Sequence, residues 1–146
     1  MASLRPSPPD AARRAPIRPP PEVLGPLIHA AAIPGIGAVR LARAVTAPAG
    51  PEAGLRDLVR SAEARLDEAE RVRVRGWVRR IRATLERDGH HVLVPGLTPY
   101  PTPLRALEDR PYPLFARGRP GLLNTETIAV VGTRSMTRSG REAAHR

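Results

Sequence analysis

Apolar residues recur at helical spacing from Val23 to Leu85, and this periodicity limits the fold more than any other feature of the chain. Four stretches carry it, at 23–31, 39–45, 55–66 and 74–85. Residues three and four positions apart lie on one face of an α-helix, so each stretch predicts an amphipathic helix with one buried side. We therefore expect a domain of four or five helices over residues 22–88. Val39 and Trp77 fall within the stripes and are expected to face inward.

The pattern changes at both ends of this region. Residues 1–21 are rich in Pro, Arg and Ala without a periodic apolar face, which predicts a disordered arm. Within the first helix, Pro26 is expected to fall in the first turn, where a missing N–H costs little. Gly89 is placed to end the last helix. Short apolar runs at 91–94, 114–116 and 127–131 then predict strands, with a helix near 140–145, so 89–146 is a separate unit.

Composition favours a polyanionic partner and leaves little room for catalysis. All 24 basic residues are arginines, and the formal net charge is +10, although a GC-rich codon bias explains part of this excess. The absence of cysteine excludes disulfides, thiol catalysis and Cys-type zinc sites. The adjacent His90 and His91 are expected to be a loop pair, and no catalytic constellation is visible. We expect no cofactor, no metal and no enzymatic activity. The chain has no secretory signal and no apolar run long enough to span a membrane, so we expect a cytoplasmic protein.

Two basic features of the helical region could contact phosphates. The segment AAIPGIGAVRLARAV, residues 31–45, fits the helix-hairpin-helix pattern, in which glycines expose backbone N–H groups at a helix start. Gly35, Gly37 and Arg40 are its candidate contacts, and a turn that merely packs two helices fits equally well. The run 71–82 places four arginines near one helix face, namely Arg71, Arg75, Arg79 and Arg82. We favour a solvated face paired with acidic neighbours (Glu68, Glu70, Glu86 and Asp88) over a phosphate-tracking one.

The segment IAVVGTRSMTRSG, residues 128–140, is the third candidate. A buried strand that ends in Gly-Thr-Arg and leads into a helix is an arrangement that binds phosphate. Gly132 would allow the backbone to pass close to a ligand, Thr133 offers a hydroxyl, and Arg134 can make a bidentate contact to phosphate. Thr137 is expected to cap the following helix. An ordinary strand-to-helix turn fits the same residues, and neither a dinucleotide-binding glycine motif nor a P-loop lysine is present.

The order of these segments resembles the DNA-processing protein A (DprA/Smf) family. The resemblance rests on YPTPLRALEDRPYPLFARG at 100–118, LLN at 122–124 and the Val-Gly-Thr-Arg segment with its following Thr and Gly, after a helical domain with a glycine-rich hairpin. It implies a fold with a helix-hairpin-helix (SAM-like) helical domain followed by a Rossmann-like α/β domain. It also implies single-stranded DNA binding in natural transformation, with the RecA recombinase as a partner. Carried over by motif, the pocket residues are Gly132, Thr133, Arg134, Thr137 and Gly140.

In that family most of the Rossmann-like domain lies beyond the Gly-Thr-Arg strand, so this chain is expected to hold only its incomplete start. An interrupted gene, which we favour, a shortened fragment and one half of a split protein would each explain this. A homodimer is expected only if the missing part is supplied. Two alternative functions remain open: a stand-alone helix-hairpin-helix module that binds DNA nonspecifically, and a nucleotide-hydrolysing enzyme on a related pocket.

Overall fold

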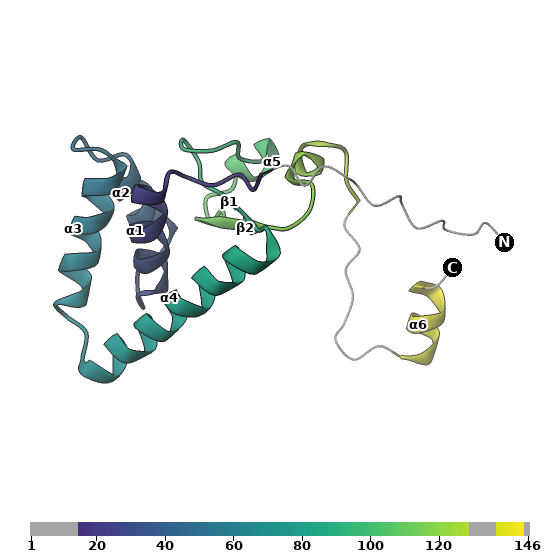
Figure 1. Ribbon diagram of the computed structural model, residues 1–146. Helices are drawn as coiled ribbons and strands as arrows, with labels where there is room; N and C mark the ends of the chain where they lie inside the picture. The colour runs from purple at the N-terminus through teal and green to yellow at the C-terminus, as the bar shows by residue number, and fades with distance from the viewer. Residues whose placement is uncertain (1–14, 129–136, 145–146) are drawn as a thin grey trace.

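The computed structural model describes residues 15–128 and 137–144, and Figure 1 shows their arrangement. The helices α1 to α4 come first, and a two-stranded sheet with short helices follows. In chain order the elements are α1 (Pro21–Ala32), α2 (Ala38–Val45), α3 (Pro51–Glu63), α4 (Glu68–Asp88), β1 (His91–Leu93), α5 (Thr102–Arg105), β2 (Leu114–Ala116), a 3-10 helix η1 (Pro120–Asn124) and α6 (Arg138–Ala144). The predicted helical region is confirmed as four helices over residues 21–88.

Local sequence signals set the ends of these helices. Asp67 and Glu70 form a capping box at the start of α4, in which each side chain accepts a hydrogen bond from the other residue's backbone N–H. Gly89 ends α4 in the left-handed conformation, as predicted, with φ 59°. Pro26 differs from expectation, because α1 begins at Pro21 and Pro26 therefore lies in its second turn. At that position the missing N–H leaves α1 with one backbone hydrogen bond fewer.

The helices enclose one apolar core. α3 packs against both α1 and α2, and α4 packs against α1. The largest fully buried side chains in this part are Leu27, Ile28, Leu41 and Leu55. At the α2–α3 contact, Gly54 allows the closest approach, since a Cβ built there would lie 2.1 Å from the carbonyl oxygen of Ala44. The core is therefore close-packed around a helix crossing that no larger residue fits.

Two residues expected in the core are exposed. Val39 is 62% exposed, and Leu41 takes the buried position on α2 instead. Trp77 is 55% exposed, whereas Val74 and Leu85 are buried on the same helix. The reason lies in the neighbours of α4: the shorter helix α1 covers only a narrow stripe of it. At 100° per residue, Trp77 lies about 70° from the centre of that stripe.

The strand β1 joins the two parts of the structure. It pairs antiparallel with β2, with Val92 opposite Phe115, and both strands lie where the sequence predicts them. The Val92 N–H also donates to the Ile17 carbonyl at 2.8 Å, so the segment 15–20 lies along the other edge of β1. The sequence predicts a disordered arm here, but in the structure these residues are hydrogen-bonded and Pro19 is buried. The remainder of the arm, residues 1–14, lies outside the described residues.

The described residues cover only part of the predicted start of a Rossmann-like domain. The sheet formed by the described residues is the antiparallel β1–β2 pair. Most of the predicted strand 127–131 lies outside the described residues, and Ile128, at its start, is 93% exposed. A parallel sheet therefore stays a prediction. No helix in the described ranges is long and apolar enough to cross a membrane.

Candidate nucleic-acid interface

The glycine-rich turn between α1 and α2 brings its three predicted residues together. Gly35 has a φ of 78°, which favours glycine, and Gly37 precedes the first turn of α2. Nothing lies within 4 Å of the space a Cβ would take at either glycine, so the turn is open. Arg40 reaches back over it, with Nη1 3.5 Å from the Gly35 carbonyl oxygen. Backbone N–H groups and a guanidinium thus share one exposed surface.

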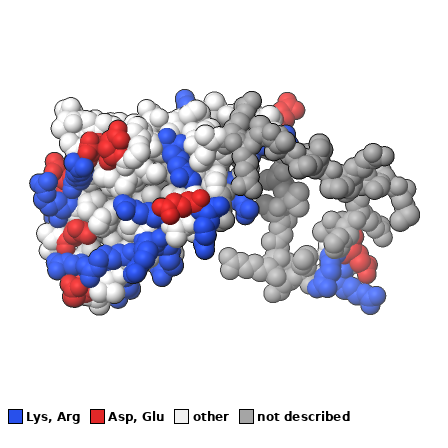
Figure 2. Space-filling view, viewed as in Figure 1, with Lys and Arg blue, Asp and Glu red and all other residues white. Residues whose placement is uncertain are grey.

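Arginines also gather along α4, as Figure 2 shows on the face that it displays. Residues 71–85 hold six arginines and no carboxylate. Three of them, Arg75, Arg79 and Arg82, line a groove of about 390 Å³ between α4 and α1, together with His29 and Glu86. The guanidinium of Arg82 lies against α1, since a Cβ at Gly25 would be 3.2 Å from its Nη2 atom. Arg79 and Arg82 form no ion pair with a described residue, so this wall of the groove can attract a polyanion.

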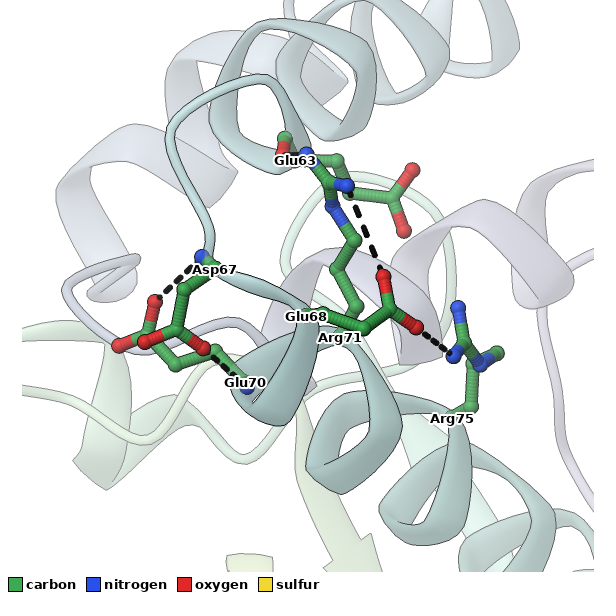
Figure 3. A network of polar contacts seen from close by, with 6 residues as sticks. All are labelled: Glu63, Asp67, Glu68, Glu70, Arg71 and Arg75. Carbon is green, nitrogen blue, oxygen red and sulfur yellow. Dashed lines mark hydrogen bonds and ion pairs between the residues drawn. The ribbon is translucent and has the colours of Figure 1, made fainter.

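Among the described acidic side chains of α4, Glu68 forms ion pairs, and its partners lie in the first turns of the helix. Figure 3 shows Glu68 between two arginines, with 3.7 Å to Arg71 and 2.9 Å to Arg75. Arg71 also donates to the Glu63 carbonyl at 3.3 Å, and Glu70 is used by the capping box. The interpretation of a salt-paired face is therefore confirmed for these two arginines.

Arg79 and Arg82, further along α4, behave differently. Neither forms an ion pair with any described residue, although Glu86 lines the same groove. On α1, His29 faces Glu63 at 2.8 Å, so its carboxylate partner comes from α3. The expected pairing of this face with acidic neighbours is therefore not found for Arg79 and Arg82. Glu86 follows both arginines in the sequence, and this order is less favourable on a helix than an acidic residue that precedes the basic one.

The third predicted site lies mostly outside the described residues. This applies to Gly132, Thr133 and Arg134. The two later residues of the motif are described: the Gly140 N–H donates to Thr137 Oγ1 at 3.2 Å, and both residues are exposed. Thr137 therefore caps the first turn of α6, as predicted. Whether these residues bind phosphate stays a prediction.

His91 has a structural role that the sequence does not reveal. Its Nδ1 accepts from the Ile17 N–H at 3.0 Å, and its Nε2 lies 3.0 Å from the Gly118 carbonyl oxygen. The neutral ring with its hydrogen on Nε2 satisfies both bonds. Next to it, the guanidinium of Arg18 donates to the carbonyls of His90 and Leu85. Within the described ranges no three His, Asp or Glu side chains gather as metal ligands do.

The residues that carry the family resemblance hold the loops after β1 in place. Tyr100 is buried, and its hydroxyl donates to the Pro111 carbonyl at 2.7 Å. Tyr112 is also buried, which raises its pKa to about 12, with a smaller opposite effect from Arg110. Asn124, the last residue of LLN, accepts a hydrogen bond from the Thr102 N–H at 2.8 Å. These motif residues thus act as internal contacts of the segment 100–124.

Comparison with known proteins finds a family match that contains this segment. Residues 91–146 match the model of the family described as DNA recombination-mediator protein A. No curated protein and no solved structure gives a significant match. The match begins at β1 and contains all the motif residues on which the resemblance rests, and it leaves the helices α1–α4 outside. The resemblance predicted from the sequence is therefore confirmed over residues 91–146, which are similar to the DNA recombination-mediator protein A family.

Proposed function

We propose that the chain binds single-stranded DNA in DNA uptake and recombination, without sequence preference and without catalysis. The observation that carries the proposal is the match of residues 91–146 to a recombination-mediator family. The net charge of +10 and the arginine groove beside α4 support it, because a polyanion is the ligand that such a surface attracts. By the same resemblance, RecA is the protein partner and the cytoplasm is the location.

The contacts that we propose are to phosphates. Arg79 and Arg82 supply guanidinium groups that no carboxylate among the described residues neutralises. The turn at Gly35 and Gly37 supplies backbone N–H groups beside Arg40. Gly132, Thr133 and Arg134 stay in the proposal through the family resemblance. Phosphate contacts position a strand and carry no base information, so binding should be nonspecific and strongly dependent on salt.

A titration of labelled oligodeoxynucleotides, followed by fluorescence anisotropy over a range of salt concentrations, tests this function. We expect similar affinity for unrelated sequences and a linear fall of log affinity with log salt. The double variant Arg79→Ala/Arg82→Ala should reduce the salt slope by about 1.4, or ~0.7 for each phosphate of a single strand that an arginine no longer neutralises. The matched control is Arg56→Ala/Arg60→Ala on α3, which removes the same charge from arginines paired with Glu52 and Asp57. Absence of binding at low salt would overturn the proposal.

A second candidate, the stand-alone helix-hairpin-helix module, is favoured by the open turn at Gly35 and Gly37. Changing Gly37 to Glu separates the two, because it puts a carboxylate beside the N–H groups of α2 with room for the side chain. Loss of binding in this variant, with full binding in Arg79→Ala/Arg82→Ala, would favour the hairpin. The opposite result would favour the groove.

A further inference from the structure

Trp77 has a position that a core residue would not have. It is the single tryptophan of the chain, and it is 55% exposed near the middle of α4. The guanidinium carbon of Arg80 lies 5.0 Å from the ring centroid, which is a cation–π arrangement. Large aromatic side chains are usually buried, whereas this indole is exposed to solvent beside an arginine. An exposed indole can stack on a ligand that has a flat face.

The charges around Trp77 define what that ligand can be. Arg73 lies one turn before it and Arg80 one turn after it, on the same flank of α4. Both arginines are exposed, and neither forms an ion pair with any described residue. The groove arginines Arg79 and Arg82 lie on another flank of the helix. The surface at Trp77 therefore combines one aromatic ring with two arginines that form no ion pair, and no carboxylate lies between residues 71 and 85.

We propose that Trp77 stacks on a base of single-stranded DNA while Arg73 and Arg80 contact the phosphates on either side of that base. This rests on the proposed function and deepens it, because it states how the chain distinguishes single strands from duplexes. Every base has a π-face, so stacking needs no particular sequence. In a duplex the faces are covered by neighbouring bases, and only the phosphates remain accessible. The groove arginines then serve both kinds of DNA, whereas Trp77 serves single strands alone.

Because the chain has one tryptophan, its fluorescence reports this contact directly. The full chain is titrated with oligo(dT) of about 20 nucleotides, long enough for a typical single-strand site. The same titration is made with an abasic strand of equal length and with a duplex. We expect quenching with oligo(dT) and little with the other two, while anisotropy of labelled strands still reports binding of all three. Quenching of equal size by the abasic strand would overturn the proposal.

The variant Trp77→Ala supplies the second measurement. It should lower affinity for oligo(dT) about 10-fold and leave duplex affinity unchanged, since one stacked base contributes on this scale. The matched control is Val72→Ala, because Val72 is also 55% exposed on α4. Circular dichroism of both variants establishes that the helices remain. Trp77→Tyr keeps a stacking ring and should restore most of the affinity, which also serves if Trp77→Ala does not fold.

The outcomes separate this inference from the function on which it rests. If no labelled strand binds at low salt, the proposed function fails. If strands bind but Trp77→Ala binds oligo(dT) like the parent, only the stacking contact fails. An equal loss for duplex and single strand would also overturn it, as would a Trp77-dependent dimer in sedimentation, which would make this surface a contact between two copies of the chain.

Discussion

The helices α1–α4 and the segment 91–124 share one apolar core, to which β1 and the residue after it contribute Val92 and Val94, but the segment depends on polar contacts as well. In the helices, apolar side chains from all four elements fill a common core, and Leu27 and Leu55 are completely buried. In the later segment, individual polar groups connect pieces far apart in the chain, as His91 does between Ile17 and Gly118. We therefore expect added side-chain volume to destabilise the helices most. The stability of the later segment should depend on single hydrogen bonds.

The largest expected effect tests the helical side of this comparison. Gly54→Ala puts a methyl group 2.1 Å from the Ala44 carbonyl oxygen and 2.7 Å from the Ala47 Cβ, so α2 and α3 must separate. We expect a loss of at least about 3 kcal/mol in the free energy of unfolding, measured by urea denaturation.

The control for this prediction is the same substitution at a helical glycine with space around it. In α4 the nearest atom to a Cβ at Gly76 is Arg80 Nη1 at 3.9 Å. Gly76→Ala should therefore stabilise the protein by about 0.5–1 kcal/mol through helix propensity. Equal effects of the two substitutions would show that the α2–α3 contact is not close-packed.

The second prediction concerns the polar side of the comparison. His91→Leu removes the partner of the Ile17 N–H and of the Gly118 carbonyl, at a site where β1 is buried. Two unsatisfied groups should cost about 2–3 kcal/mol. The loss should appear as faster hydrogen exchange in β1 and at residues 15–20, with smaller changes in α1–α4.

His90→Leu is the matched control, because the His90 side chain has no hydrogen-bond partner among the described residues for its buried Nδ1 atom. This substitution should change stability by less than about 1 kcal/mol. If both histidine variants lost protection to the same degree, shape rather than hydrogen bonding would hold the segment.

Local features of the fold were predictable, and features that depend on distant neighbours were not. The helix stripes, the turn at Gly35 and the end at Gly89 follow from residues within a few positions of each other. The exposure of Trp77 depends on how much of α4 a shorter helix covers. The role of His91 depends on a partner 74 residues away, which no spacing rule indicates.

The candidate site divides in the same way. Gly35, Gly37 and Arg40 are neighbours in the sequence, and the structure brings them together as expected. The groove needs α1 to lie against α4, so periodicity alone could not find it. The sequence also does not indicate which arginines of α4 are paired. The contact of Glu68 with Arg75, for example, depends on how far the two side chains reach and not on composition. The prediction for the Gly-Thr-Arg segment lies outside the described residues.

Tyr112 sharpens the comparison, because it lies in the later segment yet packs into the apolar core of the helices. Burial raises its pKa from 10.0 to about 12. In the unfolded chain the hydroxyl loses its proton near the ordinary value, whereas the folded protein keeps it to higher pH. Stability from this group is therefore complete below pH 10 and falls as pH rises through the range 10 to 12.

We expect a loss of about 1–2 kcal/mol across this range from Tyr112, a smaller effect than those above because the tyrosine is only partly desolvated. Urea denaturation at several alkaline pH values measures it, with Tyr112→Phe as the comparison variant. The phenylalanine ring keeps the core contact and has no proton to lose, so the variant should have a shallower alkaline slope. The pKa of Tyr100 is also raised by burial, so some slope should remain in the variant. Identical slopes for the two proteins would mean that the Tyr112 hydroxyl is not desolvated, and the later segment would then not be seated on the helical core through this residue.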